Sequence, residues 1–144
     1  MKSILLFFLL ISIGLYKFQD INVIDCAGLQ NIVLNNVTVK YNITQNIVCT
    51  NFNTLGDNSN SFLGIIEGNS FTISGMNISS ASQYVSFIAS GNGCTVRNVK
   101  IDGLNIASSG ATYGATFFAI CSNCKFISFF TIIRITMIQT SISY

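Results

Sequence analysis

The sequence predicts an all-β fold in which short strands are wound into stacked coils, an arrangement known as a solenoid. An eight-residue pattern of alternating apolar positions, interrupted by a two-residue corner, occurs at residues 32–39, 71–78 and 94–101. Alternation with a period of two is typical of strands, and the corner joins two of them. A unit that recurs in this way predicts coils whose apolar residues are buried only when the coils stack. The composition agrees, because Asn, Ser, Thr, Ile, Val and Phe dominate and favour strands and turns.

The N-terminus has the features of an export signal. Lys2 supplies a positive charge, and residues 4–15 form an apolar run interrupted only by Ser12 and Gly14. These small residues suit cleavage after Gly14, so we expect a signal peptide at residues 1–14 and the coil domain at residues 15–144. The run is shorter than the about 20 residues that a membrane span requires. The alternative interpretation is a retained membrane anchor that ends at Lys17.

Further strands and turns are expected between the three copies of the pattern. Segments rich in Asn, Asp, Ser and Gly predict loops, and short apolar runs predict strands. The additional strands are expected, in order, at residues 41–48, 62–66 and 84–89, with loops or turns at 51–61, 67–70, 79–83, 90–93 and 108–110.

A second self-similarity relates residues that lie thirty positions apart. Residues 85–89 match residues 115–119, and the same shift places Cys94 on Cys124, Val96 on Phe126 and Val99 on Phe129. A fourth, degraded copy of the pattern therefore begins at Cys124, and the apolar residues after it predict a terminal pair of strands. We expect about four to six coils, with an incomplete C-terminal end.

The corner of the pattern is occupied by Asn36, Gly75, Asn98 and Ser128 in successive copies. Gly and Asn are the residues that best tolerate a left-handed backbone. Asn amides stacked at strand spacing can also form a ladder of hydrogen bonds. We therefore expect Asn36, Gly75 and Asn98 to lie in one column, a corner ladder. The same alignment places Leu34, Ile73 and Val96 in one file of the core.

Five cysteines are present, and in an exported chain they meet an oxidising environment. At least one disulfide is expected, and the odd count leaves one thiol unpaired or paired outside the chain. Cys121 and Cys124 have CxxC spacing, but they lack the βαβ context of a redox motif and the second pair of a zinc site. Since Cys94 and Cys124 occupy the first inward position of a copy, we expect them to be small apolar core residues.

Three sequons mark Asn36, Asn42 and Asn77 as candidate N-glycosylation sites. Each can carry a glycan in an exported chain if the side chain is exposed. Asn77 lies between the inward residues Met76 and Ile78, so it is expected to point outward, and Asn36 lies at a corner. The alternative is that an Asn-rich chain contains such triplets by chance.

Residues 62–78 resemble the F-x-G-x-F-D-G-N-x-x-T-I-x-G-L-x-I segment of secreted right-handed parallel β-helix proteins. Gly68, Asn69, Thr72 and Ile73 carry the match, and the broader similarity covers roughly residues 25–131. Proteins of this family have the pectate-lyase-like fold, often carry GLUG repeats, and many are adhesin-like surface proteins. The resemblance implies a right-handed parallel β-helix at residues 15–144, export, and a surface or adhesive role.

The sequence contains no convincing catalytic site. The chain has no His, which excludes Ser-His-Asp and Cys-His arrangements within it. Glu67 and Asp102 are the only acids next to copies of the pattern, and their different offsets do not predict a carboxylate pair. A lyase-like site would need Lys100 or Arg97 as base near Asp102, and a solvated face is the simpler interpretation. Residues 57–60 offer oxygen ligands for calcium, but their spacing favours a plain turn.

We therefore expect a secreted or cell-surface module with a structural, adhesive or glycan-binding role and without catalysis. The alternative is a polysaccharide-active β-helix enzyme, a lyase or glycosidase, or a fragment of one. No cofactor or metal is expected. The expected partners are extracellular glycans or surface proteins, with membrane contact only through the N-terminal segment. A net charge of +2 without a basic run argues against nucleic acid. An open apolar C-terminal end predicts end-to-end stacking.

Overall fold

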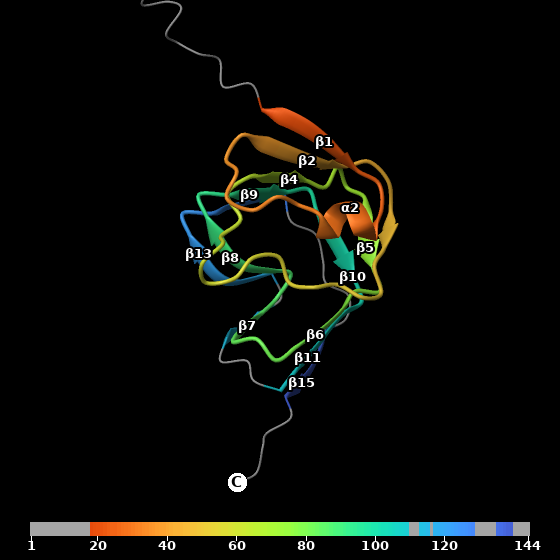
Figure 1. Cartoon of the computed structure of the whole chain (residues 1–144). Helices are drawn as coiled ribbons and strands as arrows, with labels where there is room; N and C mark the ends of the chain where they lie inside the picture. Colours follow the sequence, from red (N-terminus) through yellow and green to blue (C-terminus); the bar gives the residue numbers. More distant parts are fainter. Residues whose placement is uncertain (1–17, 110–112, 116, 129–134, 140–144) are drawn as a thin grey trace, which may run out of the picture.

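The computed structural model describes residues 18–109, 113–115, 117–128 and 135–139 (Figure 1). The expected signal peptide at residues 1–14 and Phe129 lie outside the described residues. Strands dominate the described part of the chain, as the sequence predicts. They are β1 (Gln19–Val23), β2 (Val39–Ile43), β3 (Ile47–Val48), β4 (Ile65–Glu67), β5 (Thr72–Ser74), β6 (Asn77–Ser80), β7 (Tyr84–Val85), β8 (Ile88–Asn92), β9 (Thr95–Arg97), β10 (Lys100–Asp102), β11 (Leu104–Ser108), β12 (Tyr113–Gly114), β13 (Phe118–Ser122), β14 (Lys125–Ile127) and β15 (Ile135–Gln139), with one short helix, α2 (Cys26–Gln30).

The strands form small parallel sheets. The largest has the order β1-β2-β4-β9-β14, and two three-stranded sheets have the orders β10-β5-β3 and β15-β11-β6. Two further pairs, β12-β7 and β13-β8, complete the pairing among the described residues. From β2 onward, consecutive described strands lie in different sheets, so the chain turns a corner between them, whereas β1 and β2 are neighbours in one sheet (Figure 1). The fold is therefore all-β with parallel sheets, and these sheets do not close into a continuous solenoid.

The pairing register confirms the thirty-residue self-similarity. Ile66 of β4 lies opposite Val96 of β9, and Val96 lies opposite Phe126 of β14, thirty residues apart in each case. Ile88 of β8 likewise lies opposite Phe118 of β13. In parallel strands, residues that lie opposite each other point to the same face of the sheet. These equivalent residues therefore form files directed at the core.

The expected file of Leu34, Ile73 and Val96 is wrong. Ile73 lies opposite Ile47 and Ile101, whereas Val96 lies opposite Ile66 and Phe126. The physical reason is that one apolar pattern marks two different corners of the fold. Residues 94–101 turn from β9 to β10, but residues 71–78 turn from β5 to β6, and the true counterpart of the second segment is residues 99–106.

The first copy of the pattern does not form a strand pair. Residues 31–38 contain turns and bends, and only Val39 enters a strand. Ile32 is buried and Leu34 is partly buried, but Val37, expected to face inward, is 58% exposed. Tyr41 helps to keep this segment out of a strand. Its hydroxyl accepts a hydrogen bond from the Val33 backbone at 2.8 Å, which holds the segment as a loop.

One continuous core lies between the sheets. Its centre contains aliphatic files and a row of aromatic rings, in which the ring centroids of Phe52 and Phe87 are 5.4 Å apart, as are those of Phe87 and Phe117. Burial of each large apolar side chain contributes about 1.5–3 kcal/mol before entropy costs. The fully buried large residues include Phe62, Ile66, Ile73, Met76, Ile78, Phe87, Ile88, Ile101 and Leu104.

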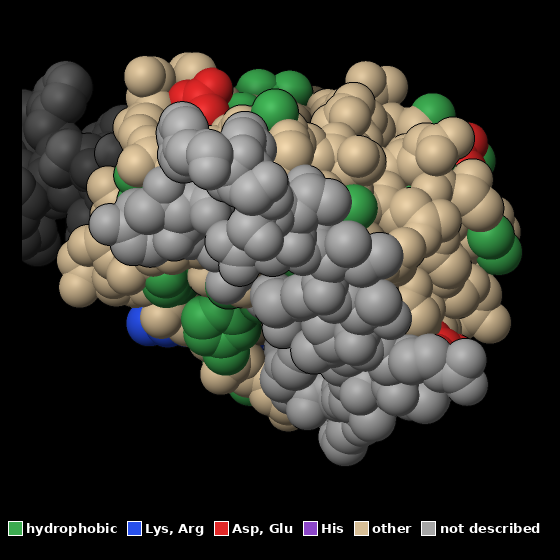
Figure 2. Space-filling model, turned by 90° about the horizontal axis from the view of Figure 1, so that it is seen from below, with side chains coloured by type: hydrophobic (Ala, Val, Ile, Leu, Met, Phe, Trp, Pro, Cys, Tyr) green, Lys and Arg blue, Asp and Glu red, His purple; other side chains and the backbone are tan. Residues whose placement is uncertain are grey.

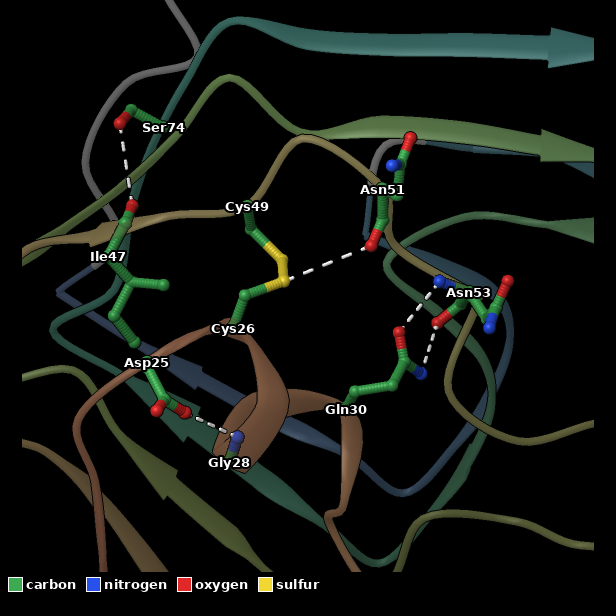
Figure 3. The surroundings of a disulfide bond; sticks show 9 residues. All are labelled: Asp25, Cys26, Gly28, Gln30, Ile47, Cys49, Asn51, Asn53 and Ser74. Atoms are coloured by element: carbon green, nitrogen blue, oxygen red, sulfur yellow. Dashed lines mark hydrogen bonds between the residues drawn. A yellow bond between two sulfur atoms is a disulfide. The ribbon is translucent and has the colours of Figure 1, made fainter.

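Helix α2 is anchored at both ends (Figure 3). The Asp25 side chain caps it by accepting a hydrogen bond from the Gly28 backbone at 2.7 Å. A disulfide joins Cys26 to Cys49, which confirms the expectation of at least one disulfide. At the C-terminal end, the Gln30 amide exchanges two hydrogen bonds with the Asn53 backbone, at 2.8 and 3.0 Å. These contacts fix the segment that follows β3.

Candidate functional site

A polar hollow of about 150 Å³ opens where the segment after β3 meets β6 and β7. Its lining contains hydroxyl groups, one side-chain amide and one aromatic ring. The lining residues are Asn53, Thr54, Gly56, Ser79, Ser80, Ser82 and Tyr84.

The three segments that form the hollow are held by backbone pairing and by hydrogen bonds from side chains. Gln30 fixes Asn53, and the Thr54 hydroxyl accepts a bond from the Ser86 backbone at 3.4 Å. The Ser80 hydroxyl accepts a bond from the Ser82 backbone at 3.0 Å, which shapes the turn after β6. Behind the hollow, β6 is paired with β11, and β7 is paired with β12. The hollow therefore rests on strands that pair in register.

The chemistry of the hollow suits an uncharged polar ligand. Hydroxyl and amide groups both donate and accept hydrogen bonds, and a tyrosine ring offers an apolar face with a polar tip. Neither a carboxylate nor a basic side chain is among the residues that line it. The described surface at this end of the molecule is largely uncharged, with few red or blue side chains (Figure 2).

A second polar cluster surrounds Glu67 at the end of β4. Its carboxylate accepts hydrogen bonds from Arg97 Nε, from Asn98 Nδ2 at 2.8 Å and from the Asn69 backbone at 3.2 Å. Burial opposes ionisation of Glu67, but the bonds from Asn98, Asn69 and Arg97 outweigh it and hold the pKa below its usual value. The cluster joins β4 to β9 through the buried carboxylate of Glu67.

Of the residues considered for a lyase-like site, Lys100 and Asp102 both lie on β10, whereas Arg97 lies on β9. Arg97 is paired with Glu67, while Asp102 ends β10, in a different sheet from Glu67. The Asp102 backbone oxygen accepts a hydrogen bond from Gly75, which fixes the corner after β10. Arg97 and Asn98 therefore hold the Glu67 carboxylate in a structural ion-pair cluster.

The expected corner ladder is not formed. Asn98 lies in register between Gly68 and Ser128, whereas Gly75 lies between Cys49 and Gly103, so the two residues belong to different corners. Asn36 lies in the bend before β2, and its side chain accepts two bonds from Thr38 at 2.9 Å. The left-handed backbone is confirmed at Gly75 (φ 65°), Asn98 (φ 53°) and Ser128 (φ 49°), but in the first copy it falls on Asn35 (φ 59°).

The sequon asparagines differ in exposure. Asn77 is exposed on β6, as expected, and its register partner is Asn105 of β11. Asn42 is partly buried on β2, between Asn22 and Glu67, and Asn36 is partly buried by its own turn. Their glycosylation remains a prediction, and Asn77 has the most accessible side chain of the three.

The turn at residues 57–60 has its own internal partners. The Asp57 carboxylate accepts bonds from the Ser59 and Asn60 backbones, at 2.7 and 2.8 Å, and from the Asn60 amide. The bonds from the Asn60 side chain and from the two backbone groups lower the pKa of Asp57. Within the described ranges, no group of three or more acidic, Cys or His side chains is arranged for a metal ion. None of the helices described there is long and apolar enough to cross a membrane.

No protein family model, curated protein or solved structure matches this chain. The abundance of Asn, Ser and Thr is visible in the sequence, but the hollow is not. Its lining residues come from three segments, and no local spacing relates them. The three serines within residues 79–82 are the one local feature of the sequence that points to the hollow.

Proposed function

We propose that this chain is a secreted or cell-surface module that binds neutral glycans through the polar hollow and has a structural or adhesive role without catalysis. The single observation that carries the proposal is the lining of the hollow, which combines hydroxyls, an amide and the Tyr84 ring. Sugars present many hydroxyls together with apolar C–H faces, so a site that both donates and accepts hydrogen bonds beside an aromatic ring matches them.

We also propose that the architecture is a right-handed parallel β-helix, the fold implied by the resemblance of residues 62–78. Support comes from register offsets that recur at 28 to 30 residues between β4 and β9, β5 and β10, β6 and β11, and β8 and β13. The handedness follows from the general rule that crossovers between parallel strands are right-handed. In this proposal, α2 covers the N-terminal end of the core.

Export is supported by two independent features. The apolar N-terminal segment has the composition of a signal peptide, and the Cys26–Cys49 disulfide is typical of oxidising compartments. Asn77 is an exposed sequon of the kind modified on that route.

A binding assay tests the glycan proposal directly. The purified protein is screened against neutral and uronic oligosaccharides, and a ligand found there is titrated by calorimetry. Tyr84→Ala and the double change Ser79→Ala with Ser82→Ala are expected to weaken binding at least tenfold. Thr72→Ala and Thr95→Ala remove hydroxyls outside the hollow and are expected to leave the affinity unchanged. Failure to bind any neutral glycan, or equal losses in both sets of variants, would contradict the proposal.

The absence of catalysis is tested on the same preparation. Incubation with uronic-acid polymers, with and without calcium, is expected to release no unsaturated or reducing products. Cleavage abolished by Asp102→Ala or Lys100→Ala would instead favour the polysaccharide-active alternative.

We further propose that the C-terminal end stacks on a second copy of the chain. Apolar residues there are partly solvent-exposed: Ile120 by 39%, Phe126 by 47% and Ile127 by 45%. Among the described strands, β14 is also the last of its sheet, and the edge of a sheet can pair with another chain. Light scattering is expected to show association that rises with concentration and falls in Ile127→Thr. A monomer at all concentrations would contradict stacking.

A further inference from the structure

Three cysteines outside the disulfide converge near the C-terminal end of the described core. Cys94 is buried, Cys124 is partly buried and Cys121 is exposed. The Sγ atoms of Cys94 and Cys124 are only 3.1 Å apart. The pair is separate from the Cys26–Cys49 disulfide, which ties α2 to the segment after β3.

The thirty-residue register brings Cys94 and Cys124 together. Thr95 of β9 pairs with Lys125 of β14, so the preceding cysteines occupy equivalent positions on adjacent strands. The Lys125 backbone donates a hydrogen bond to the Cys94 carbonyl at 2.8 Å, which holds the two positions in register. Neighbouring strands lie about 4.8 Å apart. That spacing falls within the Cα separation of about 4.4–6.8 Å that disulfides adopt.

Gly91 provides the space that the two sulfur atoms occupy. A Cβ at position 91 would lie 2.9 Å from the Sγ of Cys94 and 2.9 Å from that of Cys124. Gly91 pairs with Cys121 in the neighbouring strand β13, so the third thiol belongs to the same neighbourhood. The sulfur pair is therefore accommodated by a glycine on one strand, with an exposed cysteine on the next.

We propose that Cys94 and Cys124 are a second cross-linking site, which forms a disulfide between adjacent strands when a small disulfide oxidant such as oxidised glutathione is present, and that Cys121 remains a free exposed thiol. Two cysteine thiols are oxidised, and one oxidised glutathione is reduced to two glutathione thiols.

The reaction proceeds by two exchange steps. The Cys124 thiolate, more accessible than Cys94, attacks one sulfur of oxidised glutathione, forms a mixed disulfide and releases glutathione as thiolate. Cys94 then loses its proton to solvent, and its thiolate attacks the Cys124 sulfur and releases the second glutathione. Burial raises the pKa of the Cys94 thiol, so little thiolate is available and this closing step is slow.

Peptide mapping tests the proposed linkage. The full chain is refolded in a glutathione redox buffer, and the remaining thiols are alkylated in denaturant. The expected result is one alkylated cysteine per chain, at Cys121, with linked peptides that contain Cys94 and Cys124. Because Lys40, Arg97, Lys100 and Lys125 are tryptic sites, Cys121 and Cys124 fall on one peptide, and Cys94 falls on another together with Cys49. Fragmentation of the linked peptides by mass spectrometry then assigns which cysteine of each peptide is bridged. Three alkylated cysteines, or a linkage between Cys121 and Cys124, would overturn the proposal.

Two variants make the result specific. Cys121→Ser is expected to retain the Cys94–Cys124 linkage and to lose the last alkylated thiol. Cys124→Ser is expected to restore alkylation of Cys94 while the Cys26–Cys49 linkage persists, which shows that the variant still folds. Disappearance of the Cys94–Cys124 linkage in Cys121→Ser would contradict the assignment of Cys121 as the spare thiol.

Discussion

At the scale of single residues, the corners depend on small side chains and on left-handed backbone positions. Gly75 and Gly103 lie in register with φ of 65° and 73°, and Gly93 and Asn123 form a second such pair with φ of 65° and 54°. The sequence predicted left-handed positions at the corner residues Asn36, Gly75, Asn98 and Ser128, and the prediction is wrong only in the first copy, where the left-handed residue is Asn35. It could not predict their columns, since local pattern does not reveal which corner of a coil a segment occupies.

Gly68 is required by close packing. A Cβ at this position would lie 2.2 Å from the Asn98 carbonyl oxygen and 2.6 Å from Val99 Cα, both backbone atoms that cannot move alone. Gly68→Ala is expected to lower the free energy of unfolding by about 3 kcal/mol. Gly93→Ala is the matched control, because nothing lies within 4 Å of its Cβ and only the positive φ is strained, at about 1–2 kcal/mol. Urea unfolding measures the free energy of unfolding of both variants. Equal losses of stability in the two variants would contradict the packing argument.

Glu67 is expected to make stability depend on pH. Its pKa in the folded state lies below the ordinary value of 4.5, so its ionised form stabilises the fold above that pH. This contribution is lost as the pH falls through the lowered pKa. Glu67→Gln is expected to cost about 1–3 kcal/mol at pH 7, because the charge-assisted bonds from Arg97 and Asn98 are lost. The difference between the two proteins should narrow below pH 4.5 in urea unfolding. A difference independent of pH would contradict the assignment.

At the scale of elements, the alternation of apolar residues predicts strands where both halves of the pattern are buried. Residues 94–101 became β9 and β10, and residues 71–78 became β5 and β6. Residues 32–39 have the same pattern but contain turns, because Tyr41 hydrogen-bonds Val33 and Val37 is exposed. Tertiary contacts of this kind override periodicity and are invisible in one sequence.

The files of buried apolar residues that run across paired strands are expected to contribute much of the free energy of unfolding. Ile101 of β10 is fully buried opposite Ile73, so Ile101→Ala should leave a cavity and cost about 2–5 kcal/mol. Ile24, which is 54% exposed, provides the matched control. Ile24→Ala should change the free energy of unfolding by about 0.5 kcal/mol or less. Similar losses for the two variants in chemical denaturation would place Ile101 outside the core.

At the scale of the whole molecule, the polar hollow forms where strand pairing brings distant segments together. The sequence predicted an all-β chain with a disulfide, a thirty-residue repeat and abundant hydroxyl groups. It did not predict the hollow, because Asn53, Ser79 and Tyr84 meet only through the pairing of β6 and β7 with other strands. It also left open which cysteines pair, since spacing does not determine disulfide connectivity.

The Cys26–Cys49 disulfide is expected to stabilise the N-terminal end of the molecule. It spans 23 residues and holds α2 against the segment after β3. The double change Cys26→Ser with Cys49→Ser should lower the free energy of unfolding by about 2–4 kcal/mol, mainly through the greater freedom of the unfolded chain. Thermal unfolding with and without reductant measures this contribution of the disulfide to stability. The wild-type protein should lose stability on reduction, and the double variant should lose markedly less.

The pairing register is the central claim, and backbone nuclear Overhauser effects between neighbouring strands test it most directly. In a uniformly labelled sample, we expect interstrand contacts that link Ile66 with Val96 and Ile73 with Ile101, in the pattern of parallel strands. Contacts that link Ile73 with Val96, or the close α-proton pairs of antiparallel hairpins, would contradict the account.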